Sequence, residues 1–144
     1  MRLNEYNNIQ VKAASKKKKN NMYDFLICFY VLDYCFFENR INMMKEDDLG
    51  VLLGEMDPNM TEDGMPIDRA VLDDWNYIVQ ISIGPSNDTE FITLIDNFLK
   101  FYEENEGFSF PLARKVIKEK KYLEYMDIAK NKASATCKLY NYQE

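Results

Sequence analysis

The carboxylates are the side chains of this 144-residue sequence that could do acid–base chemistry, because the chain has no histidine. Without histidine there is no Ser-His or Cys-His nucleophile pair and no histidine metal ligand. Asp73–Asp74 and Glu103–Glu104 are adjacent pairs. Neighbouring residues on a helix point in different directions, so neither pair predicts a converging dyad. No glycine-rich phosphate motif occurs. We expect a protein that is not an enzyme and uses no cofactor, with a carboxylate-only enzyme as a minor alternative.

Residues 57–68 have part of the spacing of a calcium-binding loop. Positions 1, 3, 5 and 7 of such a loop would hold Asp57, Asn59, Thr61 and Asp63. Glu62, however, stands where the sharp turn needs glycine, and Asp68 stands where a bidentate glutamate is usual. Two prolines also fall in the segment 57–66. We therefore expect no metal site.

The three cysteines, Cys28, Cys35 and Cys137, predict neither disulfides nor zinc. Their number is odd and no Cys-x-x-Cys motif occurs. Cys28 and Cys35 are seven residues apart, which places them on one face of a helix, and free cysteine is usually a small buried apolar residue. This pattern fits a reducing, cytoplasmic compartment.

Charge is distributed unevenly along the chain. Residues 46–106 hold 16 acidic and two basic residues, a net charge of −14, whereas residues 1–45 and 107–144 each carry +4. One interpretation is that the basic termini fold back and neutralise the acidic middle. The other is an acidic surface that attracts a basic protein partner and speeds association. The overall charge of −6 argues against nucleic acid as the partner.

The second interpretation names candidate partner-binding residues. They are the acidic residues of the exposed loop and the helix starts, together with a second patch near residue 105. In the first patch they are Glu55, Asp57, Glu62, Asp63, Asp73 and Asp74, and in the second Glu103, Glu104 and Glu106.

Apolar residues at three- and four-residue spacing predict the helices that position these carboxylates. We expect helices over about 22–44, 46–56, 68–79, 89–104 and 112–132, and a loop over 57–66. Asp68 is an N-cap candidate and Gly107 a C-cap candidate. Trp75, the single tryptophan, is expected in the core, and Gly64 in a turn with positive φ. The tail 135–144 is expected to dock as a short strand or to stay loose.

These elements predict an all-α fold: a single-domain bundle of four to five helices over 22–144, preceded by a frayed basic arm over 1–21. The apolar segment 25–37 fits either a helix or a strand, because its many aromatic residues also favour strands. Its 13 residues are too few to span a bilayer, which needs about 20. Asp33 interrupts the segment and no signal-peptide cleavage site follows it. We expect a buried helix and no membrane partner.

Residues 49–75 resemble small bacterial immunity proteins of contact-dependent inhibition and polymorphic-toxin systems. The resemblance rests on Leu49-Gly50, Met56-Asp57-Pro58, Asp63-Gly64, Asp68-Arg69-Ala70 and Asp74-Trp75. It departs at Asn59-Met60-Thr61 and at Arg69, where proline is expected. The resemblance implies an inhibitor of a cognate toxin, and the charge favours a basic nuclease domain as that toxin. The alternative function is a regulatory or structural interaction module without a toxin.

Overall fold

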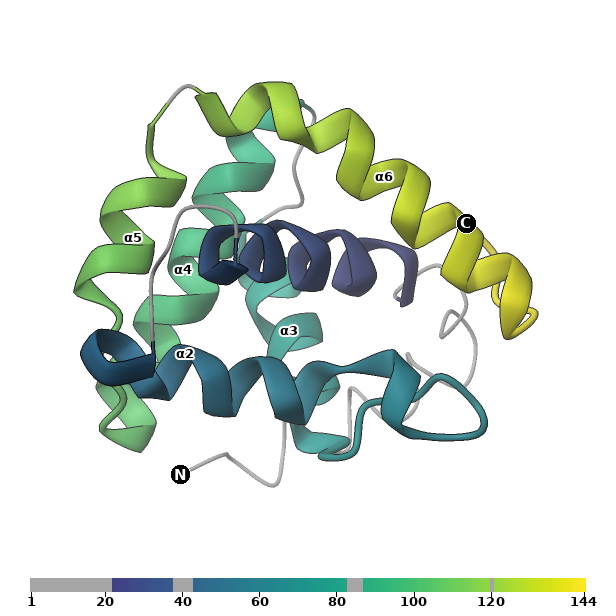
Figure 1. The fold of residues 1–144 in the computed structure, drawn as a ribbon, viewed down its shortest axis with the longest axis horizontal. Coiled ribbons are helices and arrows are strands. Elements are labelled where there is room, and N and C mark those ends of the chain that lie inside the picture. The colour runs from purple at the N-terminus through teal and green to yellow at the C-terminus, as the bar shows by residue number, and fades with distance from the viewer. Residues whose placement is uncertain (1–21, 38–42, 83–86, 120) are drawn as a thin grey trace.

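The structure is a computed structural model that describes residues 22–37, 43–82, 87–119 and 121–144. The predicted basic arm over 1–21 lies outside the described residues. Within them the chain is all-α and forms no strand, which confirms the predicted fold class (Figure 1). In this described part no helix is long and apolar enough to cross a bilayer.

The helices follow the predicted order with shifted ends. The first, which we name the aromatic helix, covers residues 22–37, so the aromatic segment is a helix and not a strand. The others are α2 (Met43–Met56), the short 3-10 helix η1 (Pro58–Met60), α3 (Ala70–Ile81), α4 (Asp88–Glu106), α5 (Pro111–Ile117) and α6 (Lys121–Leu139). Gly107 ends α4 in the left-handed conformation (φ 71°), as predicted.

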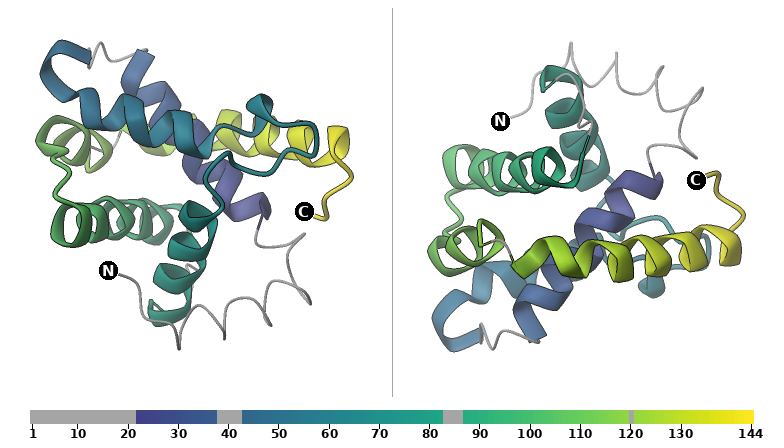
Figure 2. Two further views of the ribbon diagram at one scale, coloured as in Figure 1. Left: turned by 90° about the horizontal axis from the view of Figure 1, so that it is seen from below. Right: turned by 90° about the horizontal axis from the view of Figure 1, so that it is seen from above.

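The aromatic helix is the centre of the core. It crosses the middle of the bundle, with α2 and α6 on either side of it in Figure 1 and with α3 and α4 behind it, as both views in Figure 2 also show. The thiols Cys28 and Cys35 are fully buried, as predicted. Trp75 is also fully buried, and its ring meets that of Phe98 edge-on at 5.4 Å between centroids.

Two predicted helix boundaries were wrong. The helix expected over 22–44 is described over 22–37, and α2, which was expected over 46–56, already begins at Met43. The helix expected over 112–132 is two helices, α5 and α6. The charged residues Lys118 and Glu119 supply no apolar face at this point. The chain therefore turns there, and α5 packs along α4 while α6 crosses the aromatic helix.

The start of α5 is held by carboxylates of α2 and α4. The first N–H groups of a helix have no acceptor within the helix, and a negative charge there also suits the helix dipole. Glu46 accepts from the N–H groups of Leu112 (2.9 Å) and Ala113 (2.8 Å). Asp48 accepts from Ser109 (2.9 Å) and Glu103 from Phe110 (2.8 Å). We name these carboxylates, with Asp96, the carboxylate cradle.

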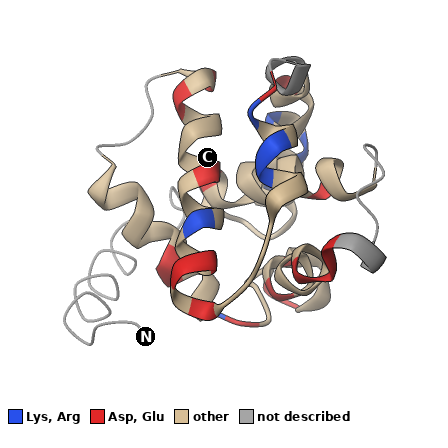
Figure 3. Cartoon of the chain, turned by 90° about the vertical axis from the view of Figure 1, so that its left-hand side faces the viewer, with Lys and Arg blue, Asp and Glu red and all other residues tan. Residues whose placement is uncertain are grey.

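Arg114 completes this arrangement from the first turns of α5. Its guanidinium binds both oxygens of Asp96, at 2.9 and 3.2 Å, and Glu103 at 2.7 Å. These bonds raise the pKa of Arg114 despite its partial burial. Lys118 adds a contact to Asp96 (3.6 Å), and Lys130 of α6 pairs with Asp88 (2.7 Å). Basic residues of the C-terminal third therefore neutralise part of acidic α4, and Figure 3 shows α4 and α5 side by side with these opposite charges.

Glu46 should be a key to stability, because its side chain is 2% exposed and joins α2 to α5. The change Glu46→Ala leaves one buried and one partly buried N–H group without an acceptor, so we expect a loss of about 2–4 kcal/mol in the free energy of unfolding. Urea unfolding measures this. The control Glu104→Ala removes an exposed carboxylate and should change stability by less than about 0.5 kcal/mol. Equal losses would contradict the role of Glu46.

Candidate functional site

The segment 57–69 follows α2 and forms an ordered surface loop, which we name the acidic loop. Its first turn is η1, for which the Asp57 carboxylate caps the N–H of Asn59 at 2.8 Å. Pro58 occupies the first position of η1 and is buried. Proline suits this position because it has no N–H to leave unpaired. The loop therefore begins at a capped and anchored turn.

The second half of the loop is tied by its own carboxylates. Asp63 accepts from the N–H of Met65 (3.1 Å) and pairs with Arg69 (3.1 Å). The bond from Met65 is the main reason that the pKa of Asp63 lies below its usual value, with Arg69 adding to it. Asp68 accepts from the N–H of Ala70 at 3.0 Å. The N-cap residue of α3 is nevertheless Arg69, so the prediction of Asp68 as the N-cap was wrong by one residue.

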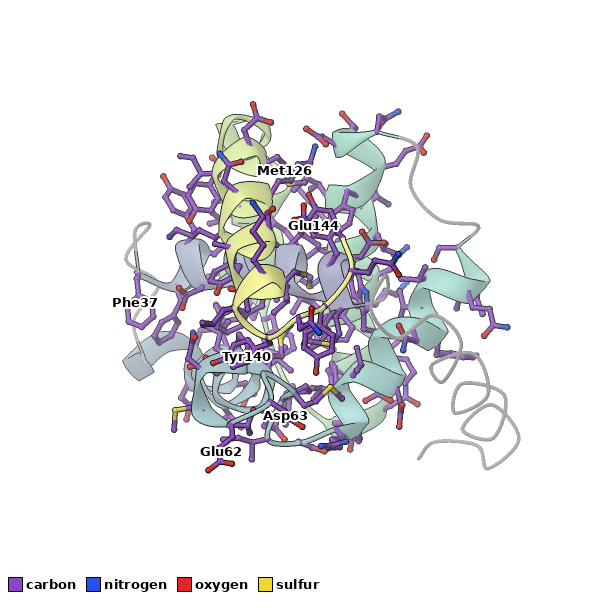
Figure 4. All side chains as sticks on the ribbon, turned by 90° about the vertical axis from the view of Figure 1, so that its right-hand side faces the viewer. Phe37, Glu62, Asp63, Met126, Tyr140 and Glu144 are labelled. Atoms are coloured by element: carbon purple, nitrogen blue, oxygen red, sulfur yellow. The ribbon has the colours of Figure 1, made fainter. Side chains whose placement is uncertain are left out.

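The C-terminal tail holds the loop from outside. The expectation of a short strand or a loose tail was wrong, because α6 continues to Leu139 and the residues after it turn back. The Tyr142 hydroxyl donates to the carbonyl oxygen of Asp63 at 2.9 Å. Figure 4 shows Tyr140 beside Asp63 at the end of α6, with Glu144 returning along the helix.

Gly64 explains how closely the tail approaches. It has a positive φ of 77°, as predicted, and a Cβ added there would lie 2.5 Å from the ring of Tyr140. Only glycine satisfies both the backbone conformation and the contact. The acidic loop is therefore fixed by bonds at both of its ends and by a tail that is 79 residues away in sequence.

The predicted partner-binding residues divide by exposure. Glu62, Asp63, Glu104 and Glu106 are exposed, whereas Glu55, Asp57, Asp73 and Glu103 are half-buried. The prediction of Asp74 as a partner-binding residue was wrong, because its side chain is 0% exposed and accepts from the Tyr102 hydroxyl at 2.6 Å. Its position on α3 faces the core against α4, so its side chain is not available on the surface to a partner.

The structure does not bring the two predicted patches together. Glu103 belongs to the carboxylate cradle, which lies at the beginning of α2. The acidic loop follows the other end of α2 (Figure 1). Within the described residues at least nine of the 16 carboxylates of 46–106 accept a bond from another group, so much of the acidic block serves the fold. These nine are Glu46, Asp48, Asp57, Asp63, Asp68, Asp74, Asp88, Asp96 and Glu103.

Two apolar residues of the acidic loop were missed from the sequence. Met60 and Ile67 have side chains that are 64% and 56% exposed. Both lie outside the helical spacing of apolar residues, which was the available signal that they do not belong to the core. Exposed apolar side chains surrounded by charged ones resemble the centre and rim of a protein interface.

Two features of the described residues bear on metal binding and on acid–base chemistry. They contain no group of three or more Cys, Asp or Glu side chains that could hold a metal ion. A hollow of about 390 Å³ lies between α4 and α5, where Ile92 and Ile117 line it. Two carboxylates line it, Asp96, which is bound to Arg114, and Glu119. Neither observation supplies a converging acid–base pair.

Comparison of the chain with models of protein families, with curated proteins and with solved structures finds no match. The resemblance of residues 49–75 to immunity proteins therefore remains a prediction.

Gly64 and Gly54 provide a matched test of the acidic loop. The change Gly64→Ala introduces both a strained backbone and a clash with Tyr140, so we expect a loss of at least about 1–2 kcal/mol in the free energy of unfolding. Gly54 lies within α2, and a Cβ there meets no atom within 4 Å. Gly54→Ala should therefore gain about 0.5–1 kcal/mol. Urea unfolding of both variants measures the difference, and the same sign for both would show that the tail does not hold the loop.

Proposed function

We propose that this protein is a cytoplasmic, non-enzymatic immunity-type protein that binds a basic bacterial toxin domain and neutralises it by occlusion. The observation that carries the proposal is the acidic loop, which is tied down internally and yet presents exposed Met60, Glu62 and Ile67. A loop already ordered before binding loses little conformational freedom when a partner docks.

The charges that remain exposed support a basic partner. Glu62 makes no hydrogen bond or ion pair with any described residue, so its charge is directed to solvent. A nuclease toxin carries a basic surface because it must hold phosphates. An acidic protein surface can occupy that position, increase the association rate and block access of the nucleic acid. The acidic loop, not the whole −14 segment, is the surface that this proposal assigns to the partner.

The function is tested by rescue of growth. The tagged full chain captures binding proteins from a lysate of the source organism, and basic proteins among them, with the products of adjacent genes, are expressed in a bacterial host. We expect one of them to stop growth, and co-expression of this chain to restore it. If the captured proteins leave growth unchanged, the alternative of a regulatory or structural interaction module replaces the immunity function.

The acidic loop is tested on the captured partner by charge and by apolar contact. Glu62→Lys should slow association, with the largest effect at low salt, and should cost about 0.2–1 kcal/mol in binding because the pair is exposed. Met60→Ala should mainly speed dissociation. Association rates measured across sodium chloride concentrations distinguish the two effects.

The matched control is Asp127→Lys, which reverses an exposed carboxylate on α6. We expect this change to leave both rates close to those of the unmodified chain. A partner whose association does not depend on salt, or which is equally sensitive to Asp127→Lys and Glu62→Lys, would show that the acidic loop is only a solvated surface.

A further inference from the structure

Two adjoining hollows lie where the end of the aromatic helix meets α2 and α6. The first, of about 190 Å³, is lined by Tyr34, Tyr125 and Lys132, and we name it the tyrosine hollow. The second, of about 240 Å³, is lined by Phe29, Phe36 and by Gly54 of α2, and we name it the phenylalanine hollow. Asp33 and Phe37 line both hollows. One carboxylate therefore faces two aromatic sites.

The tyrosine hollow shows how this surface holds a cation. The ammonium group of Lys132 lies 5.9 Å from the ring centroids of both Tyr30 and Tyr125. It also donates a hydrogen bond to the Tyr125 hydroxyl at 3.2 Å. Tyr34 stacks on Tyr125 at 3.8 Å between centroids. A cation within about 6 Å of an aromatic ring is attracted by its negative face, so the chain places its own lysine in this hollow.

The phenylalanine hollow has the same chemistry without a cation from the described residues. Three phenylalanines supply aromatic walls, and Asp33 and Asp57 supply carboxylates from two elements. Among the described residues, no lysine or arginine lines this hollow. Lys132 of the tyrosine hollow interacts with Asp33 electrostatically, but no hydrogen bond joins Asp33 to a described residue. Burial raises the pKa of Asp33; Lys132 opposes that shift, and Asp57 adds to it. The surroundings of Asp33 therefore disfavour its ionised form.

The hollow is open to a side chain from outside. A Cβ added at Gly54 meets no atom within 4 Å, and the Phe37 side chain is 65% exposed at the rim. A volume of about 240 Å³ is several times the ~30 Å³ that one water molecule occupies in the liquid. Figure 4 shows Phe37 projecting from the edge of the molecule.

We propose that the phenylalanine hollow binds an arginine side chain of a partner protein, with Asp33 as the counter-ion and the phenylalanine rings as walls. Arginine fits better than lysine because its planar guanidinium stacks on aromatic rings and binds carboxylates through paired donors. Asp57 belongs both to this hollow and to the acidic loop, so the hollow continues the partner surface. The inference rests on the proposed function in taking a basic partner, and it names the side chain that is recognised.

The test uses a probe and needs no identified partner. The ¹⁵N-labelled full chain is titrated with N-acetyl-arginine amide while backbone amide shifts are recorded. We expect saturable shifts at residues 33–37 and 50–57, with a dissociation constant of about 1–10 mM. N-acetyl-citrulline amide has nearly the same shape without the charge and should cause no saturable shift. Saturable shifts with citrulline would overturn the role of the counter-ion.

Two variants test the hollow and one serves as the control. Asp33→Asn should weaken arginine binding at least about tenfold, and Gly54→Leu should block it by filling the hollow. Asp127→Asn changes an exposed carboxylate on α6 and should leave binding unchanged. If Asp33→Asn and Asp127→Asn weaken binding equally, the probe reports only general negative charge and the proposal fails.

Thermal unfolding separates a lost site from a lost fold. A carboxyl with a raised folded pKa contributes stability below its unfolded pKa, and that contribution disappears as the pH rises through the folded value. At pH 7 the ionised Asp33 carboxylate costs stability because it is partly buried. Asp33→Asn removes the charge, so the melting temperature of the variant at pH 7 should exceed that of the unmodified chain by a few degrees. The difference should shrink as the pH falls toward 3.8, the ordinary value for aspartate. Lost binding with a higher melting temperature supports the proposal.

A second occupant is distinguished by deleting residues 1–21, which include the run Lys16–Lys19. If arginine binds only after the deletion, the chain's own lysines fill the hollow and the partner assignment is overturned. The outcome is also independent of the rescue experiment. If arginine binds the hollow but no captured protein stops growth, this inference stands and the immunity function is refuted. If the chain restores growth and the Asp33→Asn variant restores it equally well, the immunity function stands and this inference is refuted.

Discussion

The capping of α5 by carboxylates of α2 and α4 is the interaction on which the arrangement of this bundle depends. Four backbone N–H groups between residues 109 and 113 donate to Glu46, Asp48 and Glu103. A short helix has few internal bonds to offset the cost of its first turn, so α5 forms where acceptors are already held. The same contacts join the start of α2 and the end of α4 to the start of α5.

This constraint changes the meaning of the acidic composition. A segment with a net charge of −14 would oppose its own compaction if all its carboxylates were free in solvent. Many of them instead accept backbone N–H groups, cap helix starts or pair with Arg114 and Lys130. The two interpretations of the charge are therefore compatible, because most of the carboxylates stabilise the fold while the acidic loop keeps an exposed charge at Glu62.

The acidic loop and the phenylalanine hollow have different physical characters, although they share Asp57. The loop is exposed and is fixed by hydrogen bonds, including one from Tyr142 at the end of the chain. The hollow is formed by aromatic rings around Asp33, whose charge is partly removed from water. The exposed charge of the loop acts mainly on the association rate of a partner. The desolvated counter-ion of the hollow acts mainly on its dissociation rate.

Spacing within single segments was enough to predict the all-α class, most helix positions and several local conformations. Gly64 and Gly107 were predicted correctly because each depends on the backbone of a few neighbouring residues. The burial of the aromatic helix was predicted because so long an apolar block is stable only in the core of a folded chain.

The remaining features were decided by contacts between residues that are far apart in the sequence. Asp74 and Glu62 have the same type of charge, yet Asp74 is buried against Tyr102 and Glu62 is exposed. The break between α5 and α6, the docking of the tail on Gly64 and the closeness of Asp33 to Asp57 likewise depend on packing. The amino-acid sequence determined which residues can carry charge or fill a core. Only the tertiary structure decided which charges are satisfied internally, because a carboxylate's partners are set by the helices that pack beside it.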